Sequence, residues 1–175
     1  MTPTDPTLNI YGTPKDIAQE MVQDCIARRL RQVNRMVTRL YDDALRNLGL
    51  TVNQLNILAT VVSQGQMQPG HLGIVLGMEK STVSRTIDRM AKRGWLEVGP
   101  GKDGRSQLLK ATQQGRQLLV KAAPVWDELQ SGVLDAVGTG GLTLLSGLGI
   151  MPEADAPEPT EDFYATEDLA AAFYQ

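Results

Sequence analysis

The segment Leu76-Gly-Met-Glu-Lys-Ser-Thr-Val-Ser-Arg85 decides the fold class, because it joins two predicted helices through a tight turn at Gly77. The first of these helices covers Pro69–Leu76, and the second covers about Lys80–Arg93. Two helices joined by so short a turn form a helix-turn-helix. This motif places its second helix in the major groove of DNA.

The second predicted helix has one apolar face and one polar face. Val83, Ile87 and Met90 recur at i, i+4 and i+7, so they form a stripe that packs inward. Arginine can bind guanine O6 and N7 with two hydrogen bonds, whereas Ser and Thr bind phosphates or base edges. Taken alone, this helix would be interpreted as an ordinary solvated amphipathic helix, and the hairpin that follows reverses that interpretation. The predicted DNA-binding residues of the polar face are Lys80, Ser81, Thr82, Ser84, Arg85 and Arg89.

A basic hairpin follows the second helix. Trp95–Val98 and Gln107–Ala111 are short runs typical of strands, and the loop between them is rich in glycine. Its tip carries Lys102 and Arg105, and an arginine on an exposed turn suits the narrow minor groove of A·T-rich DNA. Asp103 can accept hydrogen bonds from that arginine and hold its guanidinium in one pose. The alternative is a plain surface turn in which Asp and Gly satisfy turn geometry.

Three further runs complete a recognisable pattern: Arg93-Gly-Trp-Leu-Glu97, Asp103-Gly-Arg105 and Ala111-Thr-Gln-Gln-Gly115. With them, the chain resembles the multiple antibiotic resistance regulator (MarR) family from roughly Asp24 to Leu148. The resemblance implies a mainly α fold with a small β-hairpin, in which a winged helix-turn-helix is flanked by long N- and C-terminal dimerisation helices. It also implies a homodimeric transcriptional regulator, most simply a repressor that leaves its double-stranded DNA operator when a small phenolic or carboxylate ligand binds.

The chain departs from the family pattern at two positions. Gln68 stands where Ser or Thr usually caps the first helix of the motif. Gly73 replaces the commoner alanine, which permits a close approach of the two helices but weakens the first helix by up to about 1 kcal/mol. Neither departure argues against DNA binding.

Composition narrows the class of protein. The 175 residues suit one domain or one compact unit with appendages. The sequence shows neither a bilayer-spanning apolar run nor a signal peptide, and its single cysteine fits a reducing compartment, so we expect a cytoplasmic, nucleoid-associated protein without membrane contact. With His71 as the lone histidine, no catalytic triad or metal site can be assembled, and we expect no enzyme, no metal and no cofactor.

The formal net charge of −3 conceals an uneven distribution. Residues 152–175 hold seven acids and no base, so the remaining chain has 13 acids against 17 bases, a balance of +4. Between Gln68 and Lys121 ten bases face four acids. The positive charge therefore lies where the DNA-binding motif lies, as phosphate binding requires.

Long helices are predicted on both sides of the motif. A helical pattern runs from about Lys15 to Asn47, some 50 Å at about 1.5 Å per residue, and Gly49 ends it. Thr51 to Gln54 form a capping box that starts the next helix, about Val52–Ser63. The predicted divisions are an arm (1–14), an N-terminal dimerisation helix (15–50), the winged helix-turn-helix (51–111), C-terminal dimerisation helices (112–151) and an acidic tail (152–175).

The C-terminal helix is expected to begin after its cap, Thr112, and to reach about Val137, with a kink at Pro124. A short helix follows at about Gly141–Leu148. Apolar faces this long bury themselves most simply against a second copy, and a two-fold dimer would place its recognition helices one DNA turn apart, near 34–36 Å. The alternative is a helical core folded within one chain.

Two candidate switches are visible. Arg28, Asn34 and Trp126 are candidates to line a ligand crevice, although Trp126 also fits plain core and Arg28 fits a surface or interface ion pair. Cys25 has Arg28 and Arg29 at i+3 and i+4, a spacing that favours a thiolate and hence redox sensing. An inert, partly buried thiol is the alternative that we favour.

The acidic tail is rich in proline, alanine and acids, which is typical of disordered segments. We hypothesise that it contacts the basic wing and competes with DNA. Deleting residues 152–175 is then expected to tighten operator binding. The effect should be seen mainly at low salt, because salt screens the attraction between the acidic tail and the basic wing. A fluorescence titration of the truncated chain against the full chain checks this, and equal affinities at low salt would refute it.

A winged helix can also serve as a protein-interaction module or as a non-specific architectural DNA-binding protein. A dry protein interface would disfavour the arginines and serines on the exposed helix face. Asp103 reduces the positive charge of the wing, so an architectural protein would gain nothing from it. The residue is useful only if the orientation of Arg105 matters.

Overall fold

The computed structural model describes residues 12–101 and 106–147. Helices dominate, and a two-stranded antiparallel sheet forms the wing, so the predicted mainly α class with a small hairpin is confirmed. No described helix is long and apolar enough to span a bilayer. The elements in chain order are α1 (Pro14–Asp24), α2 (Ile26–Leu45), the 3-10 helix η1 (Arg46–Leu48), α3 (Val52–Gln64), α4 (Pro69–Val75), α5 (Lys80–Lys92), β1 (Leu96–Pro100), β2 (Gln107–Ala111) and α6 (Gln113–Gly147).

The N-terminal helix is broken, and the prediction of one continuous helix from Lys15 to Asn47 was wrong. Cys25, with ψ 107°, separates α1 from α2. Just beyond it, Arg28 donates to the Val22 carbonyl, and Arg29 donates to the Gln23 carbonyl at 2.8 Å. The arginine side chains thus satisfy carbonyls at the end of α1, which stabilises the break.

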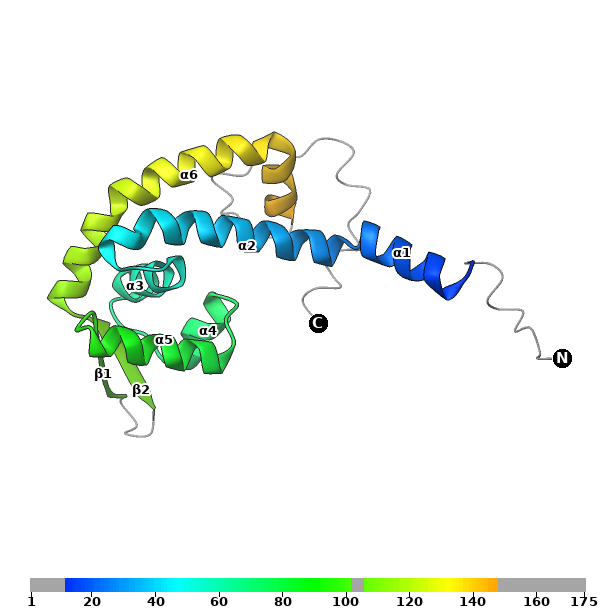
Figure 1. The fold of residues 1–175 in the computed structure, drawn as a ribbon. Coiled ribbons are helices and arrows are strands. Elements are labelled where there is room, and N and C mark those ends of the chain that lie inside the picture. The colour runs from blue at the N-terminus through cyan, green and yellow to red at the C-terminus, as the bar shows by residue number, and fades with distance from the viewer. Residues whose placement is uncertain (1–11, 102–105, 148–175) are drawn as a thin grey trace.

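The start of α1 is held by a capping box. The Thr13 hydroxyl donates to the Asp16 carboxylate at 2.6 Å, and the Thr13 amide donates to the same oxygen at 3.0 Å. These two hydrogen bonds lower the pKa of Asp16. None of the residues of α1 is buried, and the helix projects from α2 away from the winged domain (Figure 1).

The connection from α2 to α3 agrees with the prediction. Gly49 adopts a left-handed conformation (φ 66°) after η1, a conformation that glycine tolerates best. Thr51 and Gln54 form the predicted capping box of α3. Asp42 on α2 accepts a hydrogen bond from the Val52 amide at 2.7 Å, so α2 itself helps to satisfy the first turn of α3. Helix α2 is therefore anchored directly to the winged domain.

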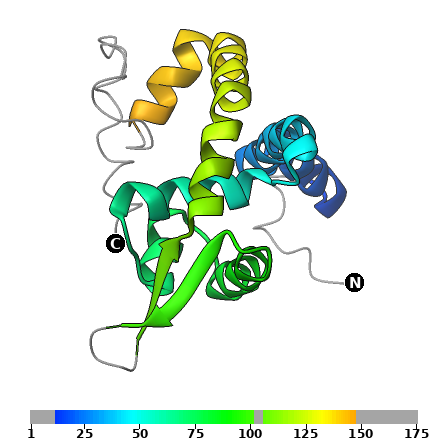
Figure 2. The same cartoon turned by 90° about the vertical axis from the view of Figure 1, so that its left-hand side faces the viewer.

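The hairpin pairs Leu96 with Ala111 and Pro100 with Gln107, so β1 extends two residues beyond the predicted Trp95–Val98. Met67, just before α4, pairs with Leu109 through hydrogen bonds of 2.8 and 3.1 Å and thereby joins the hairpin to the helix-turn-helix. Figure 2 shows the hairpin beside α5 at the lower end of the molecule. The winged domain is thus built around one hydrophobic core, whose most buried members include Leu45, Ile57, Leu58, Val61, Leu72, Val83, Met90 and Leu109.

Helix α6 rises from the hairpin and passes α2 (Figures 1 and 2). Thr112 caps its first turn as predicted, accepting a hydrogen bond from the Gly115 amide at 3.0 Å. The helix continues through Pro124, and its non-helical residue is Gly138 (φ 66°, ψ 179°). The chain turns sharply at Gly138, after which the predicted short C-terminal helix follows within the same element, and the kink expected at Pro124 stays a prediction.

One polar contact joins α2 to α6 above the winged domain. The Tyr41 hydroxyl donates to the Gln130 amide oxygen at 2.9 Å, and burial raises the pKa of this phenol. Around this contact the two helices enclose a largely apolar groove, lined between Val33 and Ala44 on α2 and between Val125 and Val137 on α6.

Candidate nucleic-acid interface

The recognition helix α5 is oriented by its apolar face. Val83, Ile87 and Met90 are at most 4% exposed, which confirms the predicted stripe. Thr86 is buried beside them, and its hydroxyl donates to the Thr82 carbonyl one turn earlier at 2.8 Å. This hydrogen bond lets a polar residue lie in the apolar face without an unsatisfied group.

The opposite face of α5 is open to solvent. Thr82 lies at its margin and is half-buried. The exposed residues of this face include Lys80, Ser81, Ser84, Arg85 and Arg89. The structure thus gathers every predicted DNA-binding residue of the helix on one accessible surface; their contact with DNA is a proposal taken up below.

Two arginines of this face are partly ordered by their own helix. The Arg85 Nε donates to the Ser81 carbonyl at 3.1 Å, and Arg89 donates to the Thr86 hydroxyl at 3.3 Å. A guanidinium has five N–H donors, so each side chain keeps further donors for a ligand. These contacts hold the side chains along the helix while leaving their charged ends available.

The turn between α4 and α5 places the two helices close together. A Cβ on Gly73 would stand 3.1 Å from the Met78 carbonyl, and the Met78 amide donates to the Gly73 carbonyl at 2.8 Å. The expectation that Gly73 serves close helix approach is therefore confirmed. Gln68 makes no side-chain capping bond to α4, and Pro69 occupies the first turn instead, where a missing N–H has no consequence.

The two strands of the wing, β1 and β2, lie beside α5 (Figure 2). The Gly101 amide donates to the Ser106 carbonyl at 2.7 Å, which closes the hairpin at the base of its loop. The predicted minor-groove residues Lys102, Asp103 and Arg105 lie outside the described residues.

The cations of the helix-turn-helix form no ion pair among the described residues. In the part of the chain that the structure describes, the ion pairs are Arg29–Asp24 at 3.1 Å and Arg46–Asp43, and both lie on the N-terminal helices. The basic side chains of α5 thus have no acidic partner among the described residues. A polyanion is the natural ligand for such a surface.

The candidate ligand residues lie at exposed positions on two helices. Arg28 and Asn34 are exposed on α2, and Trp126 on α6 is 43% exposed, so the alternative of plain core for Trp126 was wrong. Arg28 binds the end of α1 rather than a ligand crevice. None of these three residues lines any described pocket.

Cys25 lies at the break between α1 and α2 and is exposed, so the prediction of a partly buried thiol was wrong. Its neighbours Arg28 and Arg29 donate to the carbonyls of α1, and Arg29 also pairs with Asp24. Both arginine side chains are therefore held at the end of α1.

Sequence reasoning missed a set of long-range contacts at the base of the wing. Arg93 donates to the Gly49 carbonyl at 2.6 Å, and its guanidinium lies 4.9 Å from the centre of the Trp95 ring. Thr112 donates to the Gly94 carbonyl at 2.6 Å. The Arg93-Gly-Trp run was visible in the sequence, but nothing local indicates that Gly49, 44 residues earlier, is its partner.

This architecture defines a class: a winged helix-turn-helix regulator whose DNA-binding domain carries two long additional helices. A family model described as "MarR family" matches residues 48–106. The multiple antibiotic resistance protein MarR of Salmonella typhimurium is 30% identical over 101 residues, which cover 57% of this chain and 69% of that protein. The chain therefore belongs to the MarR family of DNA-binding transcriptional regulators, and the prediction that it is no enzyme is confirmed by that membership.

Solved structures agree with this assignment. A mutant MarR of E. coli in complex with operator DNA superposes with a TM-score of 0.66 over 76% of this chain and 98% of that one, and at 22% identity it supports the fold alone. The M. tuberculosis regulator MosR in complex with DNA is 26% identical, with a TM-score of 0.61 over 87% of this chain and 100% of that one.

Proposed function

We propose that the chain binds a pseudo-palindromic DNA operator, with α5 in the major groove and the wing in the adjacent minor groove. The observation that carries the proposal is the exposed, uncompensated face of α5, set on a buried stripe that fixes its orientation. Lys80, Ser81 and Thr82 at the start of the helix would contact phosphates and base edges. Arg85 would read a base, Ser84 and Arg89 would add contacts from the same face, and Lys102 and Arg105, with Asp103 orienting Arg105, would enter the minor groove.

Relatives support this proposal. Both the E. coli and the M. tuberculosis structures named above contain DNA. A footprinting experiment on a duplex selected from a randomised library tests it. Two protected major-groove segments one helical turn apart, flanked by minor-groove protection, are expected. Uniform protection along the duplex would instead indicate non-specific architectural binding.

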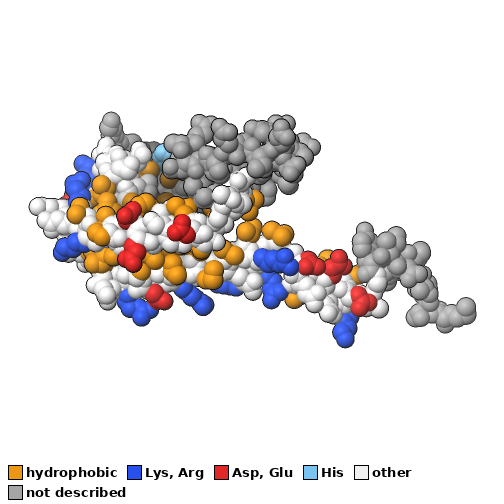
Figure 3. All heavy atoms as spheres, turned by 90° about the horizontal axis from the view of Figure 1, so that it is seen from above, with side chains coloured by type: hydrophobic (Ala, Val, Ile, Leu, Met, Phe, Trp, Pro, Cys, Tyr) orange, Lys and Arg blue, Asp and Glu red, His pale blue; other side chains and the backbone are white. Residues whose placement is uncertain are grey.

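The chain is proposed to act as a homodimer through α2 and α6, the helices that we assign to dimerisation. Figure 3 shows hydrophobic side chains along these helices, and several are half or more exposed. An apolar groove of about 660 Å³ runs between α2 and α6. Apolar surface on this scale favours association. The exposed members on α2 and the end of α1 are Met21, Val22, Ile26, Leu30, Val33, Met36 and Leu40.

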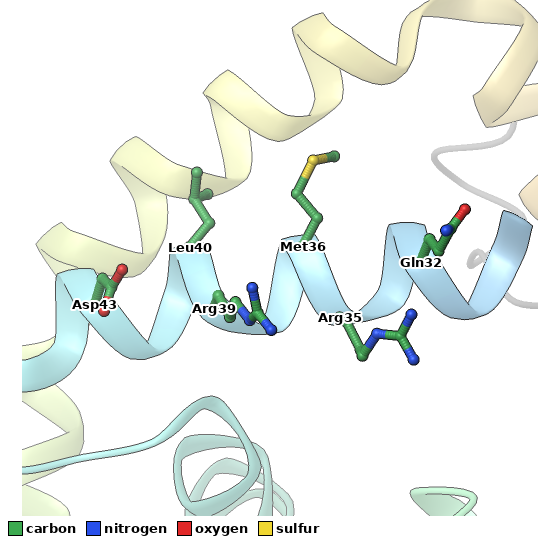
Figure 4. A pocket seen from close by; sticks show the side chains of 6 residues that line it. All are labelled: Gln32, Arg35, Met36, Arg39, Leu40 and Asp43. Atoms are coloured by element: carbon green, nitrogen blue, oxygen red, sulfur yellow. The ribbon is translucent and has the colours of Figure 1, made fainter.

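The two sides of α2 differ in a way that orients the dimer. In Figure 4, Met36 and Leu40 point toward α6, whereas Arg35 points away from it toward the winged domain. A shallow groove of about 500 Å³ follows this helix and has both polar and apolar residues along it. The apolar side is therefore the one expected to meet a second copy.

Replacing Val33 by glutamate is expected to weaken the dimer by about tenfold, because a carboxylate would have to leave water at the interface. Val33 is 50% exposed in the single chain, so the fold itself should tolerate the change. Sedimentation velocity over a concentration series measures the dissociation constant. Arg31→Gln, two residues away at an exposed position outside both grooves, lowers the charge by the same amount and should leave the dimer intact. Equal dimer constants for the two variants would contradict the proposal.

We further propose that the dimer represses transcription and that a small phenolic or carboxylate ligand releases it. The resemblance to the family supports this, since occupancy of a crevice that changes the spacing of the recognition helices would weaken DNA binding. In vitro transcription from a promoter containing the selected operator, with and without 2-hydroxybenzoate, tests both parts. Repression that the compound relieves is the expected result, and activation by the protein would contradict it.

A further inference from the structure

The three residues between α5 and β1 are tied to helices on two sides. On the first side, the Arg93 guanidinium donates to the Gly49 carbonyl at 2.6 Å. Gly49 directly follows η1, which continues α2, so this hydrogen bond reaches from the end of the recognition helix to the end of a dimerisation helix. The same guanidinium lies over the ring of Trp95, the residue that precedes β1, at 4.9 Å.

On the second side, the start of α6 is fastened to the same segment. The Thr112 hydroxyl donates to the Gly94 carbonyl at 2.6 Å, and the Thr112 amide donates to the Trp95 carbonyl at 3.1 Å. Gly115 lies so close that a Cβ there would stand 2.2 Å from the Trp95 carbonyl oxygen. The segment between α5 and the wing is therefore held between the C-terminal end of α2 and the N-terminal end of α6.

The chemistry of Arg93 suits a clamp. A carbonyl at the end of a helical segment carries partial negative charge, which favours a cation. The planar guanidinium can donate in its plane to Gly49 while its face rests on Trp95, and these two contacts together restrict its rotation. Lysine can supply a donor but no planar face, so it can replace only part of the contact.

We infer that Arg93 is a positioning residue for operator recognition, which fixes the angle between α5 with its wing and the dimerisation helix α2. In a two-fold dimer this angle sets the separation of the two recognition helices, and so the spacing of half-sites that the protein accepts. The inference rests on the proposed dimeric operator binding. It assigns Arg93 no contact with DNA.

The experiment measures spacing discrimination. Affinities are determined by fluorescence anisotropy for the selected operator and for duplexes with one base pair added or removed between the half-sites. Wild type is expected to lose about thirtyfold on either change. Arg93→Met should bind the selected operator about three- to tenfold more weakly and lose only a few-fold more on the altered spacings. Arg93→Lys should fall between these two proteins.

A matched variant separates positioning from charge. Lys92→Met removes the same charge from the neighbouring exposed residue. It is expected to weaken all three duplexes by the same factor and to preserve the full thirtyfold discrimination. The salt slope of Arg93→Met should equal that of wild type, because a residue without a phosphate contact releases no counterion. A slope lower by about one would mean that Arg93 binds phosphate, and would overturn the inference.

A second measurement does not depend on DNA. Amide exchange of peptides covering Gly49–Leu50 and Gly94–Leu96 should quicken in Arg93→Met, while peptides of the α3 core keep wild-type rates. If wild type selects no operator, the proposed function fails, and exchange still reports on the clamp. If wild type selects an operator and Arg93→Met keeps full spacing discrimination, the inference fails alone. Unchanged exchange at both segments would overturn the clamp itself.

Discussion

Replacing Arg85 by alanine is expected to lower operator affinity by about 1–3 kcal/mol at each half-site, and therefore by about 2–6 kcal/mol for a dimer. Arg85 is exposed on the polar face of α5, and its Nε is bound to the Ser81 carbonyl. That hydrogen bond leaves the two terminal nitrogens of the guanidinium free to donate to guanine O6 and N7. Binding to random DNA should fall far less, because a base contact supplies discrimination more than general attraction.

The check is a pair of anisotropy titrations, one with the selected duplex and one with a scrambled duplex. Arg31→Ala is the matched control: it removes the same charge from an exposed position on α2, a helix that Figure 1 shows on the far side of the winged domain from the hairpin. The control should bind both duplexes like wild type. Equal losses for the two variants would mean that Arg85 contributes only its charge and reads no base.

Replacing Gly115 by alanine is expected to destabilise the fold by about 3 kcal/mol or more. The added Cβ would stand 2.2 Å from the Trp95 carbonyl oxygen and 3.1 Å from its carbon, and backbone atoms cannot move aside as a flexible side chain can. The clash lies between α6 and the base of the wing, so relieving it requires a shift of one of these elements, which costs at least as much as ordinary overpacking.

Urea unfolding at a single protein concentration measures this loss, since dimerisation would make stability depend on concentration. Gly70→Ala is the control. Gly70 is a residue of α4 where an added Cβ would meet no neighbouring atom within 4 Å, so alanine there should be neutral or stabilise by up to about 1 kcal/mol. A Gly115→Ala midpoint equal to that of Gly70→Ala would contradict the close packing of α6 on Trp95.

The sequence predicted the winged domain well because its signals are local. The stripe of Val83, Ile87 and Met90, the box of Thr51 and Gln54, and the cap at Thr112 each depend on residues within two helical turns. Short-range periodicity and capping therefore sufficed to predict the helix-turn-helix and the polar face of α5.

The prediction of one continuous N-terminal helix failed because the contacts at its break are not visible in the apolar pattern. Nothing in the apolar pattern marks a break at Cys25, because the pattern continues across it and two arginines stabilise the ends from outside the stripe. The sharp turn of α6 lies at Gly138, whose positive φ is readily adopted only by glycine. The hydrophobic pattern alone does not predict where a helix breaks.

In the candidate site, too, local features could be predicted and long-range contacts could not. The α5 residues could be placed from periodicity, whereas the long-range partner of Arg93 could not. Arg28, Asn34 and Trp126 were selected for residue type beside an apolar face, and type does not determine which residues meet in space. The wing residues Lys102, Asp103 and Arg105 lie outside the described residues, and their role stays a prediction.

Sequence-selective DNA binding is the central claim, and one measurement tests it most directly. Fluorescence anisotropy would compare wild type on the library-selected duplex and on a scrambled duplex across a salt series. The account predicts a palindromic selected sequence, at least about a thousandfold preference for it, and a steep salt dependence on both duplexes. Failure to select any sequence, with equal affinity for both duplexes, would contradict the account and favour a protein-interaction or architectural role.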